Sequence, residues 1–411
     1  MPSSSFFSQF LCSSNDLDTV SILQCLSSLT GCVYLANNHT PIIAFSPVSY
    51  CIQKNKKFLH YTLNQKSKYT QTELQDLKSF IDINQTKIPS NSHRFNGGYI
   101  GFFDYNFSAN QQIPNQHRPQ PTFFLGQYLT FLRLENQQWV FYSTEENSEE
   151  IFNNIKHLIK NKPISTPSFS MTMPCQARWN KNQYLNAFKK IQDYIRAGDC
   201  YQINLTQEFT AKTTGNLLDA AHELWQLTNA PYAGYLKIDD FELLSCSPEL
   251  FIDFETERKI VTKPIKGTMP RYADPILDEQ SKQTLKSSEK DQAENVMIVD
   301  LLRNDLSVYA ETGTVKTPKL FEIESFNQVH HMVSEVTATL QANVHPVDVL
   351  LSALPGGSIT GAPKIRAMEI IEELEGAPRG AYCGSMGYFN FDGTGSWNIL
   401  IRSVQKYPDV L

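Results

Sequence analysis

Two short segments place a carboxylate and a lysine where acid–base and nucleophilic chemistry are possible. Ser247–Glu249 follows a short apolar run, and a carboxylate at the end of a buried strand can have a raised pKa and act as a general acid. In the segment 263–268, Pro264 restrains the backbone and Gly267 permits close approach to a ligand. A partly desolvated lysine loses its proton more readily, so Lys266 is a candidate nucleophile. Taken alone, a solvated turn is the commoner explanation of each segment.

An acidic helix and a glycine-rich loop are two further candidates. The apolar spacing predicts a helix over residues 291–304, and its Glu294 could bind Mg²⁺, which prefers oxygen ligands. Surface ion pairs explain the same charges equally well. The loop 355–364 is rich in glycine and runs into a helix, whose N-terminal N–H groups suit an anion. The loop matches neither a P-loop nor a dinucleotide fingerprint, and a tight turn would also explain it.

Two adjacent histidines, His330 and His331, precede an alternating apolar segment. Neighbouring positions on a strand face opposite ways, so at most one of them is expected to reach a site. No Cys/His spacing indicates zinc, and no G-x-S-x-G motif indicates a serine hydrolase.

Bulk properties exclude several classes of protein. The 411 residues carry a formal charge of −6, which gives no general attraction for nucleic acid. No apolar run is long enough for a membrane span, and the first residues do not form a signal peptide. Eight cysteines without a C-x-x-C pair indicate reduced thiols. The sequence therefore predicts a cytoplasmic globular protein.

The elements expected to position these residues are of mixed α and β type. The texture changes near residue 165, where a Pro/Ser/Thr-rich connection follows segments with strand-like alternation. Strands are expected at 98–103, 139–142 and 201–206. Helices are expected over 184–195, with an apolar stripe that includes Phe188 and a C-terminal stop at Gly198, and from Pro363 onward.

These segments come in the order found in the chorismate-utilising enzymes, a family that includes anthranilate, aminodeoxychorismate, isochorismate and salicylate synthases. The resemblance covers residues 175–405, and its ordered motifs make a chance match negligible. It implies an α+β fold of two large antiparallel β-sheets packed face to face with outer helices. It also implies an N-terminal region, 1–165, and a chorismate-binding domain, 175–405. The matching stretches are Ser247–Glu249, Pro264–Thr268, Asp291–Asp305, Val329–Ser334, Ser358–Glu375, Arg379–Tyr388 and Ser396–Ser403.

One residue selects within this family. Aminodeoxychorismate synthases carry a lysine in the Pro-Ile-x-Gly-Thr motif where anthranilate synthases carry alanine, and this chain resembles the former through Lys266. The resemblance implies that the lysine attacks C2 of chorismate and expels the 4-hydroxyl. Ammonia then adds at C4 and gives 4-amino-4-deoxychorismate for para-aminobenzoate and folate synthesis. An alanine cannot act in this way. Anthranilate synthase remains the alternative.

The same resemblance assigns the other site residues. Glu249 would protonate the leaving hydroxyl, and Glu294 would be one of two glutamates that bind Mg²⁺. His331 matches a histidine near the substrate. The positions that match chorismate contacts are Gly267, Thr268, Thr360, Tyr382 and Arg402. Arg402 suits a carboxylate because its guanidinium can form two parallel hydrogen bonds.

Ammonia is expected from a separate glutamine amidotransferase, because nothing in this sequence resembles a glutaminase. Relatives continue after the Ile-Arg-Ser strand with a Gly-Gly-Gly loop and a helix that supplies a second magnesium glutamate. Neither follows Ser403 here. We therefore expect a bare sheet edge and a poorly active chain. A non-catalytic remnant that binds the glutaminase is the alternative from another class.

Overall fold

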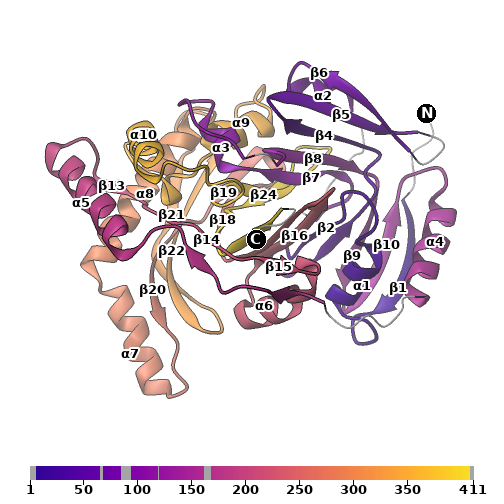
Figure 1. Cartoon of the computed structure of the whole chain (residues 1–411), viewed down its shortest axis with the longest axis horizontal. Helices are drawn as coiled ribbons and strands as arrows, with labels where there is room; N and C mark the ends of the chain where they lie inside the picture. The colour runs from indigo at the N-terminus through magenta and orange to yellow at the C-terminus, as the bar shows by residue number, and fades with distance from the viewer. Residues whose placement is uncertain (1–5, 65–67, 85–93, 119, 162–167, 408–411) are drawn as a thin grey trace.

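The computed structural model describes residues 6–64, 68–84, 94–118, 120–161 and 168–407. Two large antiparallel sheets pack face to face, with helices on their outer faces (Figure 1). This arrangement confirms the predicted fold class. Both sheets take strands from both sides of residue 165, so that position marks a change of sequence texture inside one interleaved β-structure.

The first sheet has eight strands. In spatial order they are β1 (Phe7–Ser13), β10 (Gln138–Ser143), β9 (Thr130–Glu135), β3 (Ile42–Ala44), β2 (Val33–Leu35), β16 (Tyr232–Ile238), β17 (Phe241–Ser247) and β26 (Ser403–Lys406). The end strand β26 pairs with β17 from Glu242 to Ser245. The segment after Arg402 forms β26, which stands at the end of this order and is therefore an edge strand of the sheet.

The second sheet is larger and contains the long strand β22. Its strands in spatial order are β20 (Ile265–Pro270), β22 (Val329–Thr339), β19 (Lys259–Thr262), β18 (Leu250–Phe254), β25 (Gly395–Asn398), β24 (Ser385–Asn390), β7 (Gly98–Phe103), β8 (Phe123–Tyr128), β4 (Ser49–Lys54), β5 (Lys57–Leu63) and β6 (Tyr69–Leu74), with β21 (Lys316–Ser325) also paired to β22. Three small ladders complete the strands: β11 (Ser170–Met171) with β15 (Thr213–Thr214), β12 (Gln176–Ala177) with β14 (Phe209–Thr210), and β13 (Gln202–Ile203) with β23 (Gly361–Ala362).

Helices cover the outer faces of the sandwich. They are α1 (Thr19–Leu26), α2 (Leu77–Ile83), α3 (Tyr105–Ala109), α4 (Ser148–Lys160), α5 (Lys181–Ala197), α6 (Ala221–Thr228), α7 (Pro275–Lys286), α8 (Glu289–Ser307), α9 (Pro346–Ala353) and α10 (Lys364–Glu375). In Figure 1, α1 and α4 lie at one end of the molecule, and α5, α7, α8 and α10 at the other. No helix in the described ranges is both long enough and apolar enough to cross a bilayer.

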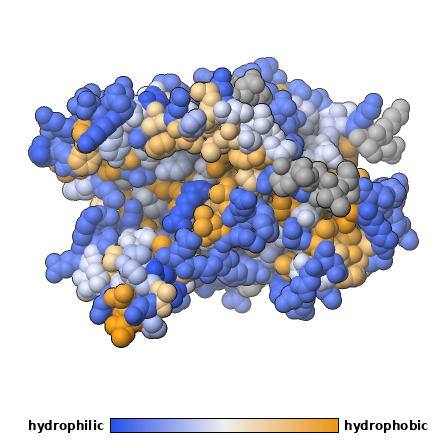
Figure 2. Space-filling model, turned by 60° about the horizontal axis from the view of Figure 1, so that its bottom comes forward, coloured by the Kyte–Doolittle hydropathy of each residue, from blue (hydrophilic) through white to orange (hydrophobic). Residues whose placement is uncertain are grey.

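The inner faces of the two sheets share one apolar core. Phe102 of β7 stacks on Phe241 of β17 with ring centroids 5.5 Å apart, so the larger sheet rests directly on the smaller one. Burying one such side chain stabilises the fold by roughly 1.5–3 kcal/mol. A second core lies under α8 and α9, and a third under α1 and α4. Hydrophilic residues cover most of the face seen in Figure 2.

Several local predictions are confirmed, and two were wrong. The helix α5 ends at Gly198, whose φ of 83° suits the left-handed cap that only glycine adopts easily. However, Phe188 is 46% exposed, while Ala187 and Ile191 are the buried residues of that helix. The strand expected over 201–206 is limited to β13, because its partner β23 offers only two residues. Pro363 is the N-cap of α10, one position before the first turn.

Candidate active site

A bulge in β20 presents the predicted lysine. Ile265 pairs with Val333 and Thr268 with His331, so β20 holds one residue more than β22 between these two pairs. Gly267 lies in this bulge with a φ of 86°, and a Cβ atom there would come within 3.0 Å of the Asp291 side chain on α8. Only glycine fits both the conformation and the space. Such a bulge re-aims the side chain beside it, which here is Lys266.

The lysine, the acid and the glycine-rich loop meet at one residue of that loop. The Nζ atom of Lys266 donates a hydrogen bond to the carbonyl oxygen of Ser358 at 3.1 Å. The hydroxyl of Ser358 donates to Oε1 of Glu249 at 3.0 Å. Three segments that are far apart in the sequence thus converge, and the lysine and carboxylate lie on the two sides of a single serine.

Glu249 lies in the turn between β17 and β18 and is only 6% exposed. Burial raises the pKa of its carboxyl to about 7, and the hydrogen bond from Ser358, the charge of Lys266, the Ile265 N–H and the charge of Arg402 oppose that rise. A carboxyl group with a pKa near neutrality holds a proton that it can donate. The environment therefore suits a general acid.

The adjacent histidines face opposite sides of β22, as predicted. His331 is 2% exposed, and its Nδ1 lies 2.9 Å from the hydroxyl of Thr268. Burial lowers its pKa to about 4, helped by the charge of Arg402 and opposed by the carbonyl of Gly267. His331 is therefore a neutral imidazole at pH 7. His330 instead contacts Asp278 of α7 at 3.1 Å and serves the scaffold.

The glycine-rich loop is held from behind by a buried ion pair. Arg379 bonds both oxygens of Glu375 at 2.7 and 2.9 Å, and their side chains are 3% and 6% exposed. Arg379 also donates to the carbonyl of Ile359 at 2.9 Å, as does the amide of Asn204 at 3.1 Å. The hydroxyl of Thr360, predicted to meet the substrate, is fully buried and donates to Gly356 instead.

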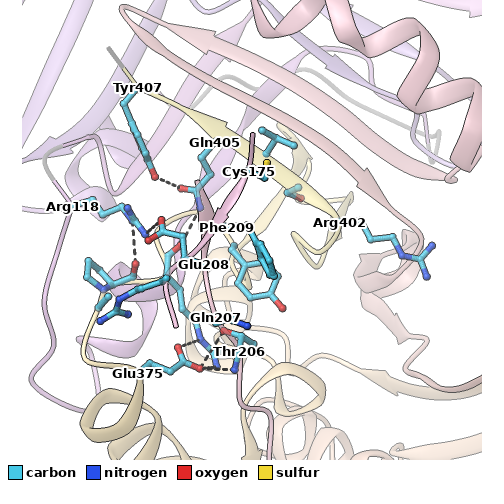
Figure 3. A pocket seen from close by; sticks show the side chains of 17 residues that line it. Arg118, Cys175, Thr206, Gln207, Glu208, Phe209, Glu375, Arg402, Gln405 and Tyr407 are labelled. Carbon is cyan, nitrogen blue, oxygen red and sulfur yellow. Dashed lines mark hydrogen bonds and ion pairs between the residues drawn. The ribbon is translucent and has the colours of Figure 1, made fainter. Parts of the chain in front are cut away.

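A pocket of about 430 Å³ is lined by Glu375 and Arg379 and contains two predicted substrate contacts, Tyr382 and Arg402. Figure 3 shows the side chain of Arg402 directed away from the group formed by Arg118, Glu208 and Glu375. That direction agrees with the effect of its charge on Glu249 and His331. Arg402 adopts a φ of 52°, which is uncommon for a residue with a side chain. This arginine therefore connects the pocket with the carboxyl and imidazole.

Glu294 lies on α8, one turn after Asp291, whose side chain borders Gly267. The carboxylate of Glu294 is 36% exposed and lies 3.9 Å from Nζ of Lys290. In the part of the chain that the structure describes, no group of three or more His, Cys, Asp or Glu could hold a metal ion. One accessible carboxylate suits Mg²⁺, which often keeps several waters and takes other ligands from the substrate.

Sequence reasoning missed the residues that hold the site together. A lone loop serine such as Ser358 gives no periodic or spacing signal. Arg379 and Glu375 are four residues apart across the end of α10, and that i, i+4 spacing of opposite charges could have identified them. Two other motif charges, Lys364 and Asp305, pair at 2.6 Å and join α10 to α8.

Comparisons with known proteins agree with this geometry. A family model described as chorismate binding enzyme matches residues 31–411. Aminodeoxychorismate synthase component 1 of Klebsiella aerogenes is 48% identical over 58% of this chain and 53% of its own length. The protein of that name from Escherichia coli K12 is 37% identical over 88% of this chain and 81% of its own. The crystal structure of anthranilate synthase component I from Streptococcus pneumoniae TIGR4 superposes with a TM-score of 0.78 at 26% identity, covering 90% of this chain and 84% of that one. The chain therefore belongs to the chorismate binding enzyme family.

Proposed function

We propose that this chain aminates chorismate at C4 and forms 4-amino-4-deoxychorismate. The observation that carries the proposal is the lysine in the bulge of β20, with its Nζ 3.1 Å from the carbonyl of Ser358 and a buried carboxyl on the other side of that serine. The similarity to aminodeoxychorismate synthases, at 37–48% identity, supports the same activity over the 32% identity to the anthranilate synthase of Bacillus subtilis.

The two side chains divide the chemistry between them. After losing its proton, the amine of Lys266 attacks C2 of the ring, the two conjugated ring double bonds shift toward C4, and the 4-hydroxyl leaves as water with a proton from Glu249. Ammonia then adds at C4, the two double bonds shift back, and the C2–N bond to the lysine breaks. His331, a neutral imidazole, can offer a hydrogen bond to the substrate without adding charge, while Arg402 can bind one of its carboxylates.

Glu294 would hold a Mg²⁺ ion, which when bound neutralises a carboxylate of the substrate. The proposal also includes a separate glutamine amidotransferase that supplies ammonia. The names of the bacterial relatives support a partner, since they describe a component 1. The reaction itself belongs to the cytoplasm in this proposal, where the eight free cysteines would stay reduced.

The test is product analysis with the purified chain, chorismate, Mg²⁺ and excess ammonium salt. We expect 4-amino-4-deoxychorismate from the wild type and a loss of at least about a thousandfold in Lys266→Ala, since the side chain that forms the covalent adduct is removed. Lys263→Ala is the matched control, because this lysine lies in the same motif but contacts Glu335 at 3.7 Å. Anthranilate as the product, or no product from the wild type, would contradict the proposal.

Without ammonia, the adduct on Lys266 should accumulate. Intact-mass and peptide spectra of the chain with chorismate alone are expected to show the ring attached to this lysine and absent in Lys266→Ala. Product formation by a chain that never shows this adduct, even under rapid quenching, would remove the covalent mechanism.

A further inference from the structure

Ser358 touches both reactive groups of the proposed site. Its hydroxyl donates to Oε1 of Glu249 at 3.0 Å, and its carbonyl accepts from Nζ of Lys266 at 3.1 Å. These bonds use different atoms of the serine, so the residue does not relay a proton between the lysine and the acid. It sets the distance between them.

Resting on the amination chemistry proposed above, we infer that Ser358 is a positioning residue, whose hydroxyl fixes the acid and whose carbonyl aims the lysine. The acid must reach the leaving 4-hydroxyl while the amine reaches C2, two carbons away on the same ring. Two side chains on separate segments, one in a strand bulge and one in a turn, keep such a spacing best when a third group connects them.

The loop that carries Ser358 is itself held in place. The next residue, Ile359, accepts hydrogen bonds at its carbonyl from Arg379 at 2.9 Å and from Asn204 at 3.1 Å. The hydroxyl of Thr360 closes the loop on Gly356 at 2.9 Å. Since Arg379 is buried against Glu375, these anchors have little freedom to move. The serine is therefore presented on a rigid support.

The contact has a consequence for protonation that a packing role would lack. The groups that face the Glu249 carboxyl are the Ser358 hydroxyl, the Lys266 ammonium, the Ile265 N–H and the Arg402 guanidinium, and each favours the ionised form. Burial raises the pKa of Glu249, and the hydrogen bond from Ser358 lowers it. Removal of the hydroxyl is therefore expected to raise this pKa further. A hydrogen bond to a charged group corresponds to about one pH unit in such a titration.

The kinetic test compares pH profiles of kcat/KM for four proteins. In the wild type, kcat/KM is expected to fall at high pH as Glu249 loses its proton. Ser358→Ala is expected to lower kcat/KM about tenfold and to move this alkaline limb upward by about one pH unit. Ser358→Thr keeps a hydroxyl and should restore both values. Ser352→Ala, which removes an exposed hydroxyl from α9, should match the wild type.

An alkaline limb that stays in place in Ser358→Ala, or that moves equally in Ser358→Thr, would overturn the inference. Should alanine prevent folding, Ser358→Cys gives the same comparison, because a thiol has a similar size but is a weak donor.

A second measurement separates this inference from the proposed function. Infrared titration of the free protein can follow the Glu249 carboxyl, identified by the band that Glu249→Gln removes. Its midpoint should rise in Ser358→Ala whether or not product forms. If the midpoint in Ser358→Ala equals that of the wild type, the positioning role is refuted even if the enzyme is active. If the midpoint rises in Ser358→Ala but the wild type forms no product, the contact is supported and the amination is refuted.

Discussion

Two regions of this molecule bury charge, and they do so in opposite ways. The first region is the buried ion pair of Arg379 and Glu375, called here the Arg379 clamp. Its guanidinium bonds both oxygens of Glu375, and the backbone N–H of Thr206 donates to the same carboxylate at 3.0 Å. The reactive region around Glu249 is less completely bonded in the described contacts. Nε2 of His331 is buried without a hydrogen-bond partner there, and the carboxyl of Glu249 has a raised pKa.

The difference separates groups that support from groups that react. A fully bonded ion pair resists both proton transfer and movement, so it serves as a fixed point. A carboxyl whose pKa is raised by burial, and only partly lowered by its contacts, can exchange its proton near neutral pH. Since Ile359 follows Ser358 and is bonded to Arg379, the fixed region holds the reactive one.

The largest effect is expected when the clamp is broken on one side. Arg379→Met leaves the carboxylate of Glu375 buried without its cation, and removal of one partner of a buried pair costs about 3–5 kcal/mol. Urea denaturation at pH 7 would measure this loss. Replacing both residues, as in Arg379→Met with Glu375→Leu, should cost clearly less, because no charge is then stranded.

The control for the clamp is an exposed pair of the same type. Arg196 and Asp193 lie 3.0 Å apart with side chains 73% and 60% exposed. Arg196→Ala should change the free energy of unfolding by less than about 1 kcal/mol. A similar small change for Arg379→Met would show that the clamp is not the fixed point of the fold.

In the reactive region, Glu249→Gln should lower activity and raise stability. The carboxyl has a pKa of about 7 in the fold and 4.5 when free. The folded state therefore binds more protons at this group than the unfolded state between these values, and Glu249 by itself lowers the free energy of unfolding by about 3 kcal/mol as pH rises from 4.5 to 7. Glutamine keeps the neutral shape and avoids this loss. Amination should fall by about 10²–10⁴-fold. Lower stability of the variant at pH 8 would contradict the assignment.

His331 contributes a pH slope of opposite sign, and His331→Gln should remove it. The imidazole has a pKa of about 4 in the fold and 6.5 when free. The unfolded state therefore binds the proton first as pH falls, and about 3 kcal/mol of stability is lost between 6.5 and 4. In the wild type the two slopes largely cancel. Denaturation at pH 5 and pH 7.5 should show the His331 slope alone in Glu249→Gln and the Glu249 slope alone in His331→Gln. The control His222→Gln, at an exposed histidine, should match the wild type.

The sequence predicted the reactive residues better than the ones that hold them. Lys266, Glu249 and His331 lie in motifs whose residue types already indicate chemistry, and the structure brings them to one place. Ser358 became visible only through its contacts. Thr360, predicted to contact substrate, turns inward, because a buried loop must satisfy its own carbonyls first.

The fold shows the same division. Local signals gave α5 and its glycine cap, since cap geometry depends on neighbouring residues. The length of β13 depends on β23, about 160 residues away in the sequence, and no local pattern records such a pairing. The exposure of Phe188 has the same origin, because burial depends on which element covers a helix.

The smallest effect is expected at the edge of the reactive region, on α8. Glu294→Gln should raise the Mg²⁺ concentration for half-maximal amination roughly tenfold, because an amide oxygen lacks the charge that a hard cation prefers. Stability should change by less than about 0.5 kcal/mol, since the carboxylate is 36% exposed and its contact to Lys290 is 3.9 Å long. Glu289→Gln, an exposed glutamate in the first turn of the same helix, should leave the Mg²⁺ dependence unchanged. Equal Mg²⁺ dependence in both variants would place the metal elsewhere and limit the reactive region to the contacts around Ser358.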